Sequence, residues 1–102
     1  MNYSSQVIEV KLSNVFSRWL GDLRDRVGRS RILSRLDRLA LGHFGDFKSV
    51  GDGVGELRVD HGPGYRLYFV RRGKTVVIVL CGGDKSSQSR DIAQAKTLAQ
   101  EF

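Results

Sequence analysis

The sequence predicts an α+β fold, a single domain of residues 1–102 in which helices pack on a mostly antiparallel sheet. Three observations lead to this prediction. Apolar and polar residues alternate near the N-terminus, two apolar stripes at helical spacing follow, and three strand-like runs then precede a last helical pattern. Because the helical segments are separated from the strands along the chain, we expect the helices to lie on one side of the sheet and to leave the other face open.

The composition is that of a folded and basic protein. Its 102 residues suit one core, and 40% of them are hydrophobic. Seventeen Lys and Arg residues against eleven Asp and Glu residues give a formal net charge of +6, which favours polyanions such as nucleic acid or an acidic partner protein. Solubility alone is the alternative explanation of this charge.

Cysteine and histidine are too few for a disulfide or a zinc motif. The single Cys81 is most simply a buried small hydrophobe, and only two histidines accompany it. We therefore expect no metal or other cofactor, and a reducing cytoplasm as the location. The longest apolar run, residues 76–81, is far too short to span a bilayer, and the N-terminus has no export pattern, so we expect no membrane association.

Residues 7–12 predict the first strand, because three aliphatic side chains alternate with charged ones. Ser13 or Asn14 can then cap a helix with an apolar stripe, in which Trp19 is best explained as a core residue. A second apolar stripe at helical spacing follows these two elements, before the strand-rich half of the chain begins.

The second helix is predicted from Ser30 to about Leu41, because Val27 and Gly28 interrupt the first stripe. Seven arginines fall within residues 18–38, against three aspartates, so this helical hairpin is unusually basic. A solvated outer face is the simpler interpretation. Contacts from the same arginines to nucleic-acid phosphates are the alternative, and they would add affinity without sequence readout.

Glycine-rich residues 43–55 separate the helices from the main strands. We expect a short strand over residues 47–50 and a loop at residues 51–53. The glycines are more plausibly turn residues than a phosphate loop, because neither a Walker sequence nor a GxGxxG run before a helix is present.

Residues 56–60 and 65–69 predict a β-hairpin, because both runs alternate and a His-Gly-Pro-Gly turn signal lies between them. If both apolar sets share one face, directly opposed residues must have numbers that sum to an even value. Arg58 then lies opposite Arg66 or Tyr68. The outward face would gather these three side chains together with Glu56, and two neighbouring guanidinium groups favour an anion.

The third strand is an unbroken apolar run over residues 75–80, of the kind that is buried on both faces in the middle of a sheet. A Gly-Gly turn at residues 82–83 would place the amine of Lys85 near the end of this strand, and Ser86 or Ser87 can cap a C-terminal helix. The turn before the strand is basic. Its candidate RNA-binding residues are Arg71, Arg72 and Lys74.

Two motifs and the element order carry a resemblance to a known family. The motifs GVGELRVDHGPGYRLYFV and LCGGDKSSQSRDIAQAK, after a strand and two helices, resemble the RelE/ParE superfamily of bacterial toxins, specifically the HigB-like branch of addiction module killer proteins. The resemblance covers nearly the whole chain. It implies a ribosome-dependent endoribonuclease that cuts mRNA in the decoding site. It also implies a cognate antitoxin, typically a small helix-turn-helix protein that itself binds operator DNA.

RNA cleavage by attack of the 2′-OH needs a base, positive charge for the phosphorane oxygens and an acid for the leaving 5′ oxygen, and it needs no metal. Arg58 and Arg66 suit the charge role, because an arginine holds phosphate by paired N–H bonds but is a poor base. His61 and Glu56 are the candidates for acid and base, and Lys85 is a further phosphate contact or acid. The resemblance supports the two arginines and the lysine, and Tyr68 could stack on a base.

The chain departs from the RelE pattern at two places. RelE-type toxins carry a second arginine after the glycine turn and a tyrosine near the start of the last helix, where this chain has Ser86 and Ile92. Different acid–base chemistry must therefore be allowed. Two other functions also fit the sequence, a ParE-like DNA gyrase inhibitor and a non-catalytic basic module for RNA or protein. The simpler interpretation of Arg58 and Arg66 is an ordinary surface ion-pair network with Glu56 and Asp60.

Overall fold

The computed structural model describes residues 7–102 and confirms the α+β class. Five strands form one sheet in the order β1-β5-β4-β3-β2, with β1 parallel to β5 and all other neighbours antiparallel. None of the helices within this range is long and apolar enough to cross a membrane. In chain order the elements are β1 (Glu9–Leu12), α1 (Asn14–Asp22), α2 (Arg26–Ala40), β2 (Phe47–Gly51), β3 (Val54–Val59), β4 (Tyr65–Arg72), β5 (Val76–Gly83), the 3-10 turn η1 (Lys85–Ser87) and α3 (Gln88–Ala99).

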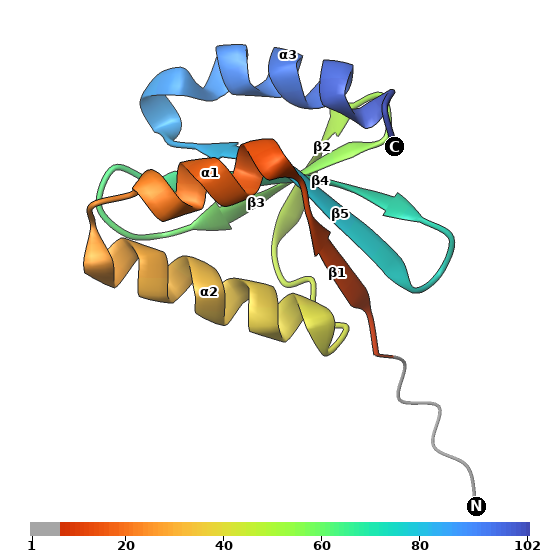
Figure 1. Ribbon diagram of the computed structural model, residues 1–102, viewed down its shortest axis with the longest axis horizontal. Coiled ribbons are helices and arrows are strands. Elements are labelled where there is room, and N and C mark those ends of the chain that lie inside the picture. The colour runs from red at the N-terminus through yellow and green to blue at the C-terminus, as the bar shows by residue number, and fades with distance from the viewer. Residues whose placement is uncertain (1–6) are drawn as a thin grey trace, which may run out of the picture.

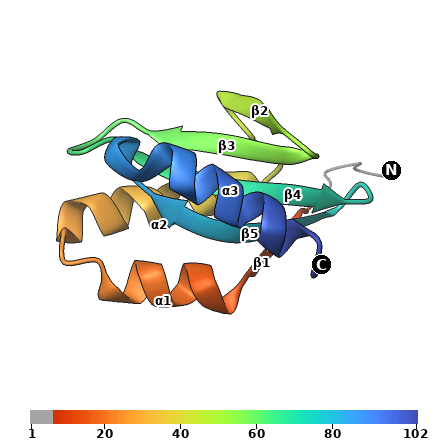
Figure 2. The same ribbon diagram turned by 90° about the horizontal axis from the view of Figure 1, so that it is seen from above.

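Helices cover both faces of the sheet. Helices α1 and α2 lie against one face and α3 lies against the other (Figures 1 and 2), and each side has its own hydrophobic cluster. Phe16 and Ile32 belong to the first cluster, and Tyr68 and Ala95 belong to the second. The prediction that the helices share one side, with the other face open, was therefore wrong. An apolar stripe shows that a helix is covered, but not by which face of the sheet.

Strand β5 lies inside the sheet and is buried on both faces, as its apolar run predicted. Val77 and Val79 face the first cluster, while Ile78 and Leu80 face the second. A bulge at Leu80, between the pairs Tyr68–Cys81 and Phe69–Val79, places two successive residues on the α3 side. Cys81 is buried there, as predicted, and burial raises the pKa of its thiol to about 12.

Polar side chains start both N-terminal helices. The Ser13 hydroxyl accepts from the backbone N–H of Phe16 at 3.0 Å and thereby caps α1. Asp25 caps α2 in the same way, because its carboxylate accepts from the N–H of Gly28 at 2.9 Å. Helix α2 thus begins before Ser30, and Gly28 lies inside it. A Cβ at Gly28 would be 2.6 Å from the ring of Tyr65, so this glycine permits a close approach and does not end a helix.

The two glycines after Cys81 were predicted to form a turn, but they are the last residues of β5. A Cβ at Gly82 would lie 2.6 Å from the ring of Trp19, and one at Gly83 would lie 1.8 Å from a carboxylate oxygen of Asp91. Trp19 is half-buried and packs against the core. The glycines therefore let side chains from α1 and α3 lie directly on the strand.

We expect Gly82→Ala to lower the free energy of unfolding by about 1–3 kcal/mol, because the added methyl group displaces the indole of Trp19. Trp19 is the single tryptophan, so urea unfolding followed by its fluorescence measures this directly. Gly21→Ala is the matched control, since no atom lies within 4 Å of its Cβ position on α1, and it should stabilise the helix slightly. Equal stability of Gly82→Ala and the wild type would contradict the close packing of Trp19 on Gly82.

Candidate phosphate-binding site

The register of the β3–β4 hairpin brings two arginines together. Arg58 pairs with Arg66, and Glu56 pairs with Tyr68, so the even-sum prediction is confirmed. Strand β2 extends the same row, because Lys48 pairs with Glu56. Directly paired residues share a face of an antiparallel sheet. All five side chains therefore lie on the face of the sheet that α3 covers. They are near the N-terminal end of α3, which η1 directly precedes.

Glu56 is the centre of the site and is fully buried, with 0% exposure. Its Oε2 accepts from the hydroxyl of Tyr68 at 3.0 Å and from Nε2 of Gln88 at 2.8 Å. Its Oε1 accepts from Nε of Arg58 at 3.2 Å, and Nε of Arg66 lies 3.8 Å from Oε2. One carboxylate thus connects β3, β4 and α3, and holds both arginines in place.

The hydrogen bonds of Glu56 keep it ionised. Burial alone would raise its pKa, but the hydrogen bonds from Gln88, Tyr68 and Arg58 and the charge of Arg66 outweigh burial and hold the pKa below its usual value. Burial and the Glu56 carboxylate together raise the pKa of Tyr68. A buried carboxylate with a lowered pKa and fully used oxygens is a poor proton acceptor, so Glu56 orients the arginines.

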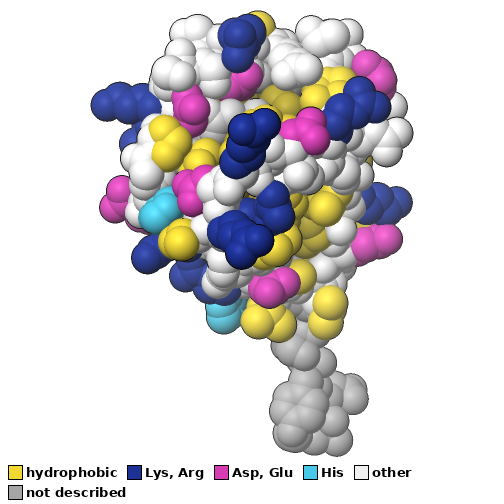
Figure 3. Space-filling model, turned by 60° about the vertical axis from the view of Figure 1, so that its left-hand side comes forward, with side chains coloured by type: hydrophobic (Ala, Val, Ile, Leu, Met, Phe, Trp, Pro, Cys, Tyr) yellow, Lys and Arg dark blue, Asp and Glu magenta, His cyan; other side chains and the backbone are white. Residues whose placement is uncertain are grey.

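Three basic residues lie at this end of the hairpin, and two of them, Arg58 and Arg66, are paired with the Glu56 carboxylate. The side chain of Arg58 is 54% exposed, whereas that of Arg66 is 10% exposed and donates from Nη1 to the carbonyl of Gly64 at 2.7 Å. Lys85 is exposed, and its backbone N–H donates to the carbonyl of Pro63 at 3.4 Å, which fixes η1 beside the hairpin loop. We call Arg58, Arg66 and Lys85 the phosphate platform. Figure 3 shows the end of the molecule that carries this loop, with Lys and Arg side chains across its middle.

Two predicted site residues lie outside the phosphate platform: Tyr68 is buried, and His61 is on the other side of the sheet. Tyr68 has 0% exposure and its hydroxyl is bound to Glu56, so the prediction that it stacks on a base was wrong. His61 faces the helical hairpin, where its Nε2 lies 3.5 Å from Oδ2 of Asp25. The hydroxyl of Tyr65 donates to the same oxygen at 2.8 Å. His61 therefore ties the hairpin loop to the start of α2, on the sheet face opposite Glu56.

The predicted RNA contacts in the β4–β5 turn lie at the other end of β4 from Arg66. The guanidinium of Arg71 lies 4.5 Å from the ring centre of Phe44, and Arg72 donates to backbone carbonyls at the end of the chain. Lys74 is exposed in the turn. The structure does not bring these three residues to the phosphate platform.

Two residues of the site were not predicted from the sequence. Gln88 supplies the shortest hydrogen bond to Glu56, and Lys48 lines a groove of about 330 Å³ together with Glu56 and Arg58. The even-sum rule would have placed Lys48, had it been applied to β2 and β3. No pattern in the sequence indicates the role of Gln88, because that role depends on which face α3 covers.

A family model classifies this chain. The model of the Phage derived protein Gp49-like family matches residues 18–101. The chain belongs to this Gp49-like family. A protein of Haemophilus influenzae described as uncharacterized is 50% identical over 95 residues, which are 93% of the Gp49-like chain and 96% of that relative.

Solved structures of RelE proteins share the fold of the Gp49-like chain. A free Escherichia coli toxin RelE with two arginines mutated to alanine superposes with a TM-score of 0.70 at 17% identity, over 88% of this chain and 95% of RelE. A chain of the Mycobacterium tuberculosis toxin–antitoxin complex RelBE2 gives a TM-score of 0.53 at 18% identity, over 83% of this chain and 99% of that chain. The Gp49-like chain therefore has a RelE-like fold, as predicted, and its assignment to the HigB-like branch stays a prediction.

Proposed function

We propose that this Gp49-like protein is the toxin of a type II toxin–antitoxin pair, and that it inhibits translation as a ribosome-dependent mRNA endoribonuclease of the HigB-like branch. The observation that carries the proposal is the phosphate platform on a RelE-like fold. Two arginines share one buried carboxylate, and Lys85 stands beside them at the end of the hairpin. Guanidinium and ammonium groups that lie close together on the surface can stabilise the negative charge that develops on a phosphate in the transition state.

Each of the three basic residues has a different role in the cleavage. Arg58 is the more open guanidinium and contacts the oxygens of the scissile phosphate. Arg66 is held by Gly64 and Glu56, so it presents a fixed positive charge below the phosphate. Attack of the 2′-OH forms a 2′,3′-cyclic phosphate and breaks the bond from phosphorus to the 5′ oxygen. The exposed Lys85 donates a proton toward this leaving oxygen, and solvent water takes the proton of the 2′-OH. In this scheme Glu56 is a positioning residue, which preorganises the charge before RNA binds.

The partners of this toxin are the ribosome with its mRNA and a cognate antitoxin. The structural relative RelBE2 is a toxin–antitoxin complex, which supports an antitoxin partner for this chain. We propose that it is a helix-turn-helix protein and that operator DNA is bound only through it. The net charge of +6 favours both an RNA target and an inhibitor with an acidic surface.

Primer extension on ribosome-bound mRNA after induced expression tests the function. We expect new 5′ ends and growth arrest with the wild type, and neither with Arg66→Ala. The antitoxin should still bind the variant, and circular dichroism should show that it is folded. Normal growth arrest by Arg66→Ala would refute the assigned site. DNA damage signalling without mRNA cleavage would instead identify a gyrase inhibitor, and growth arrest with neither signal would indicate a non-catalytic basic module.

A further inference from the structure

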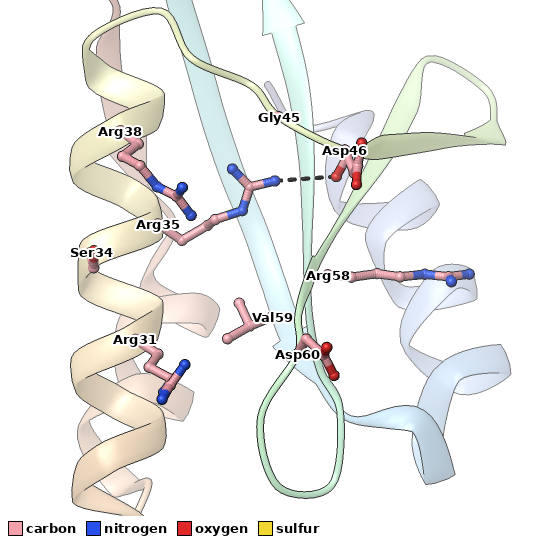
Figure 4. A pocket seen from close by; sticks show the side chains of 9 residues that line it. All are labelled: Arg31, Ser34, Arg35, Arg38, Gly45, Asp46, Arg58, Val59 and Asp60. Atoms are coloured by element: carbon pink, nitrogen blue, oxygen red, sulfur yellow. Dashed lines mark hydrogen bonds between the residues drawn. The ribbon is translucent and has the colours of Figure 1, made fainter.

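A second groove, of about 520 Å³, lies between α2 and the edge of β3 (Figure 4). Strand β2 pairs with β3 only as far as Leu57, so the edge of β3 is uncovered beyond this point. We call this space the α2 groove. Its charged lining consists of Arg31, Arg35 and Arg38 on α2, and of Asp46, Arg58 and Asp60 on the opposite side.

Arg35 builds the floor of the α2 groove. It is 7% exposed, and its Nη2 donates to the backbone carbonyls of Phe44 at 2.9 Å and of Asp46 at 3.2 Å. Gly45 has a φ of +61°, and a Cβ there would lie 2.7 Å from Nη1 of Arg35. Burial lowers the pKa of Arg35, and the charge of Arg38 adds to this effect. A glycine and a buried guanidinium thus hold the loop before β2 in a fixed position.

Arg31 and Arg38 stand on either side of Arg35 and are both exposed. They extend from α2 toward β3 in Figure 4. They are seven positions apart in the helix, which separates them by about 10 Å along the axis at about 1.5 Å per residue. Among residues 7–102, no carboxylate oxygen lies within 4.0 Å of a guanidinium nitrogen of Arg31 or Arg38. Both are therefore available to an anion that enters the groove.

The α2 groove shares Arg58 with the phosphate platform. Asp46 and Arg58 line both this groove and the neighbouring groove that contains Lys48 and Glu56. The two grooves therefore meet at the edge of β3, with the side chain of Arg58 directed away from α2 (Figure 4). We propose that single-stranded RNA bound at the platform crosses the edge of β3 into the α2 groove, where Arg31 and Arg38 bind its flanking phosphates. This inference extends the proposed function to a longer RNA path.

The charges on the strand side favour RNA over an acidic peptide. Asp46 and Asp60 would repel the carboxylates of such a peptide. A nucleotide instead brings ribose hydroxyls and base amino groups, which can donate to a carboxylate, while its phosphates face the arginine forks across the groove. Phosphate contacts of this kind add affinity that does not depend on base sequence.

Fluorescence anisotropy with single-stranded RNA probes of 4 and 12 nucleotides tests the path. We expect the wild type to bind the longer probe at least about ten-fold more tightly, and Arg31→Gln/Arg38→Gln to lose this gain while it binds the short probe normally. The slope of log affinity against log salt for the longer probe should fall by about 1.4, at about 0.7 for each lost phosphate contact.

Arg18→Gln/Arg24→Gln is the matched control, because both arginines are exposed on and after α1 and the loss of charge is the same. It should bind the longer probe within about two-fold of the wild type. Ser34→Glu is a second variant, which keeps the arginines but adds a negative charge to the groove and should weaken only the longer probe.

The inference would be overturned if Arg31→Gln/Arg38→Gln and Ser34→Glu both kept the full difference in affinity between the 12- and 4-nucleotide probes. A loss of binding to a hexaglutamate peptide with unchanged RNA binding would also overturn it, because the groove would then be a peptide site. Either result combined with mRNA cleavage by the wild type leaves the proposed function intact. If the groove variants lost the tighter binding of the 12-nucleotide probe but the wild type did not cleave mRNA in cells, the RNA path would be supported and the nuclease function refuted.

Discussion

Arg58→Ala is expected to lower the rate of mRNA cleavage by about 10²–10³-fold, the usual cost of removing one preorganised donor from a charged transition state. The reason is that Arg58 is the open member of the arginine pair, with a side chain 54% exposed against 10% for Arg66. Its bond to Glu56 sets the direction of the guanidinium before RNA arrives. Quantitative primer extension over a time course, with purified ribosomes and one mRNA, measures the effect.

Arg58→Lys separates charge from geometry. A lysine keeps the positive charge but has no planar fork for two phosphate oxygens, so we expect it to recover only part of the lost rate. Arg18→Ala removes an exposed arginine on α1 and should leave the rate within about two-fold. Cleavage by Arg58→Ala at the wild-type rate would show that the open arginine does not contact the reacting phosphate.

Glu56→Ala is expected to lower the free energy of unfolding by about 3–5 kcal/mol, because it removes one partner of a buried charge pair. Arg66 would lose its ion-pair partner Glu56, and Tyr68 and Gln88 would lose their acceptor. Glu56→Gln keeps the shape and one acceptor oxygen and should lose less. Urea unfolding measures both variants, with the exposed Glu101→Ala as a control within about 0.5 kcal/mol of the wild type. Equal losses for Glu56→Ala and Glu101→Ala would contradict the central role of this carboxylate.

The same carboxylate makes stability depend on pH. The pKa of Glu56 is lower in the folded protein than its usual value of 4.5, so its contribution is fully present above that value. This contribution is lost as the pH falls from about 4.5 through the lower pKa of the folded state. Stability in this range should therefore fall more steeply in the wild type than in Glu56→Gln, and parallel curves would contradict the assigned pKa direction.

Local patterns in the sequence were sufficient for much of the fold. The strand–helix–helix order and the pairing of Arg58 with Arg66 follow from apolar periodicity and from the two-residue repeat of a strand. The start of α2 was missed because Gly28 was interpreted as a helix break, whereas it makes room for Tyr65. A glycine that permits close packing cannot be told from a turn glycine without the neighbouring element.

The site was harder to predict than the fold. Glu56 and Tyr68 are polar, and a polar residue in an alternating strand predicts a solvent-facing position. Both are buried because α3 crosses this face and Gln88 completes their hydrogen bonds. These hydrogen bonds depend on how α3 packs on the β3–β4 hairpin, and no local spacing in the sequence predicts this packing. The contact of His61 with Asp25 likewise could not be predicted, because it depends on how the hairpin loop meets the helices.

The parallel pairing of β1 with β5 also determines when this sheet can form during biosynthesis. The hydroxyl of Ser13 donates to the carbonyl of Leu80 at 2.5 Å, across a sequence separation of 67 residues. The first strand leaves the ribosome long before its partner, and at about 5–20 residues per second it must wait several seconds for β5. A nascent chain interrupted before β5 therefore has neither a complete sheet nor Lys85, and the phosphate platform forms only after both have been synthesised.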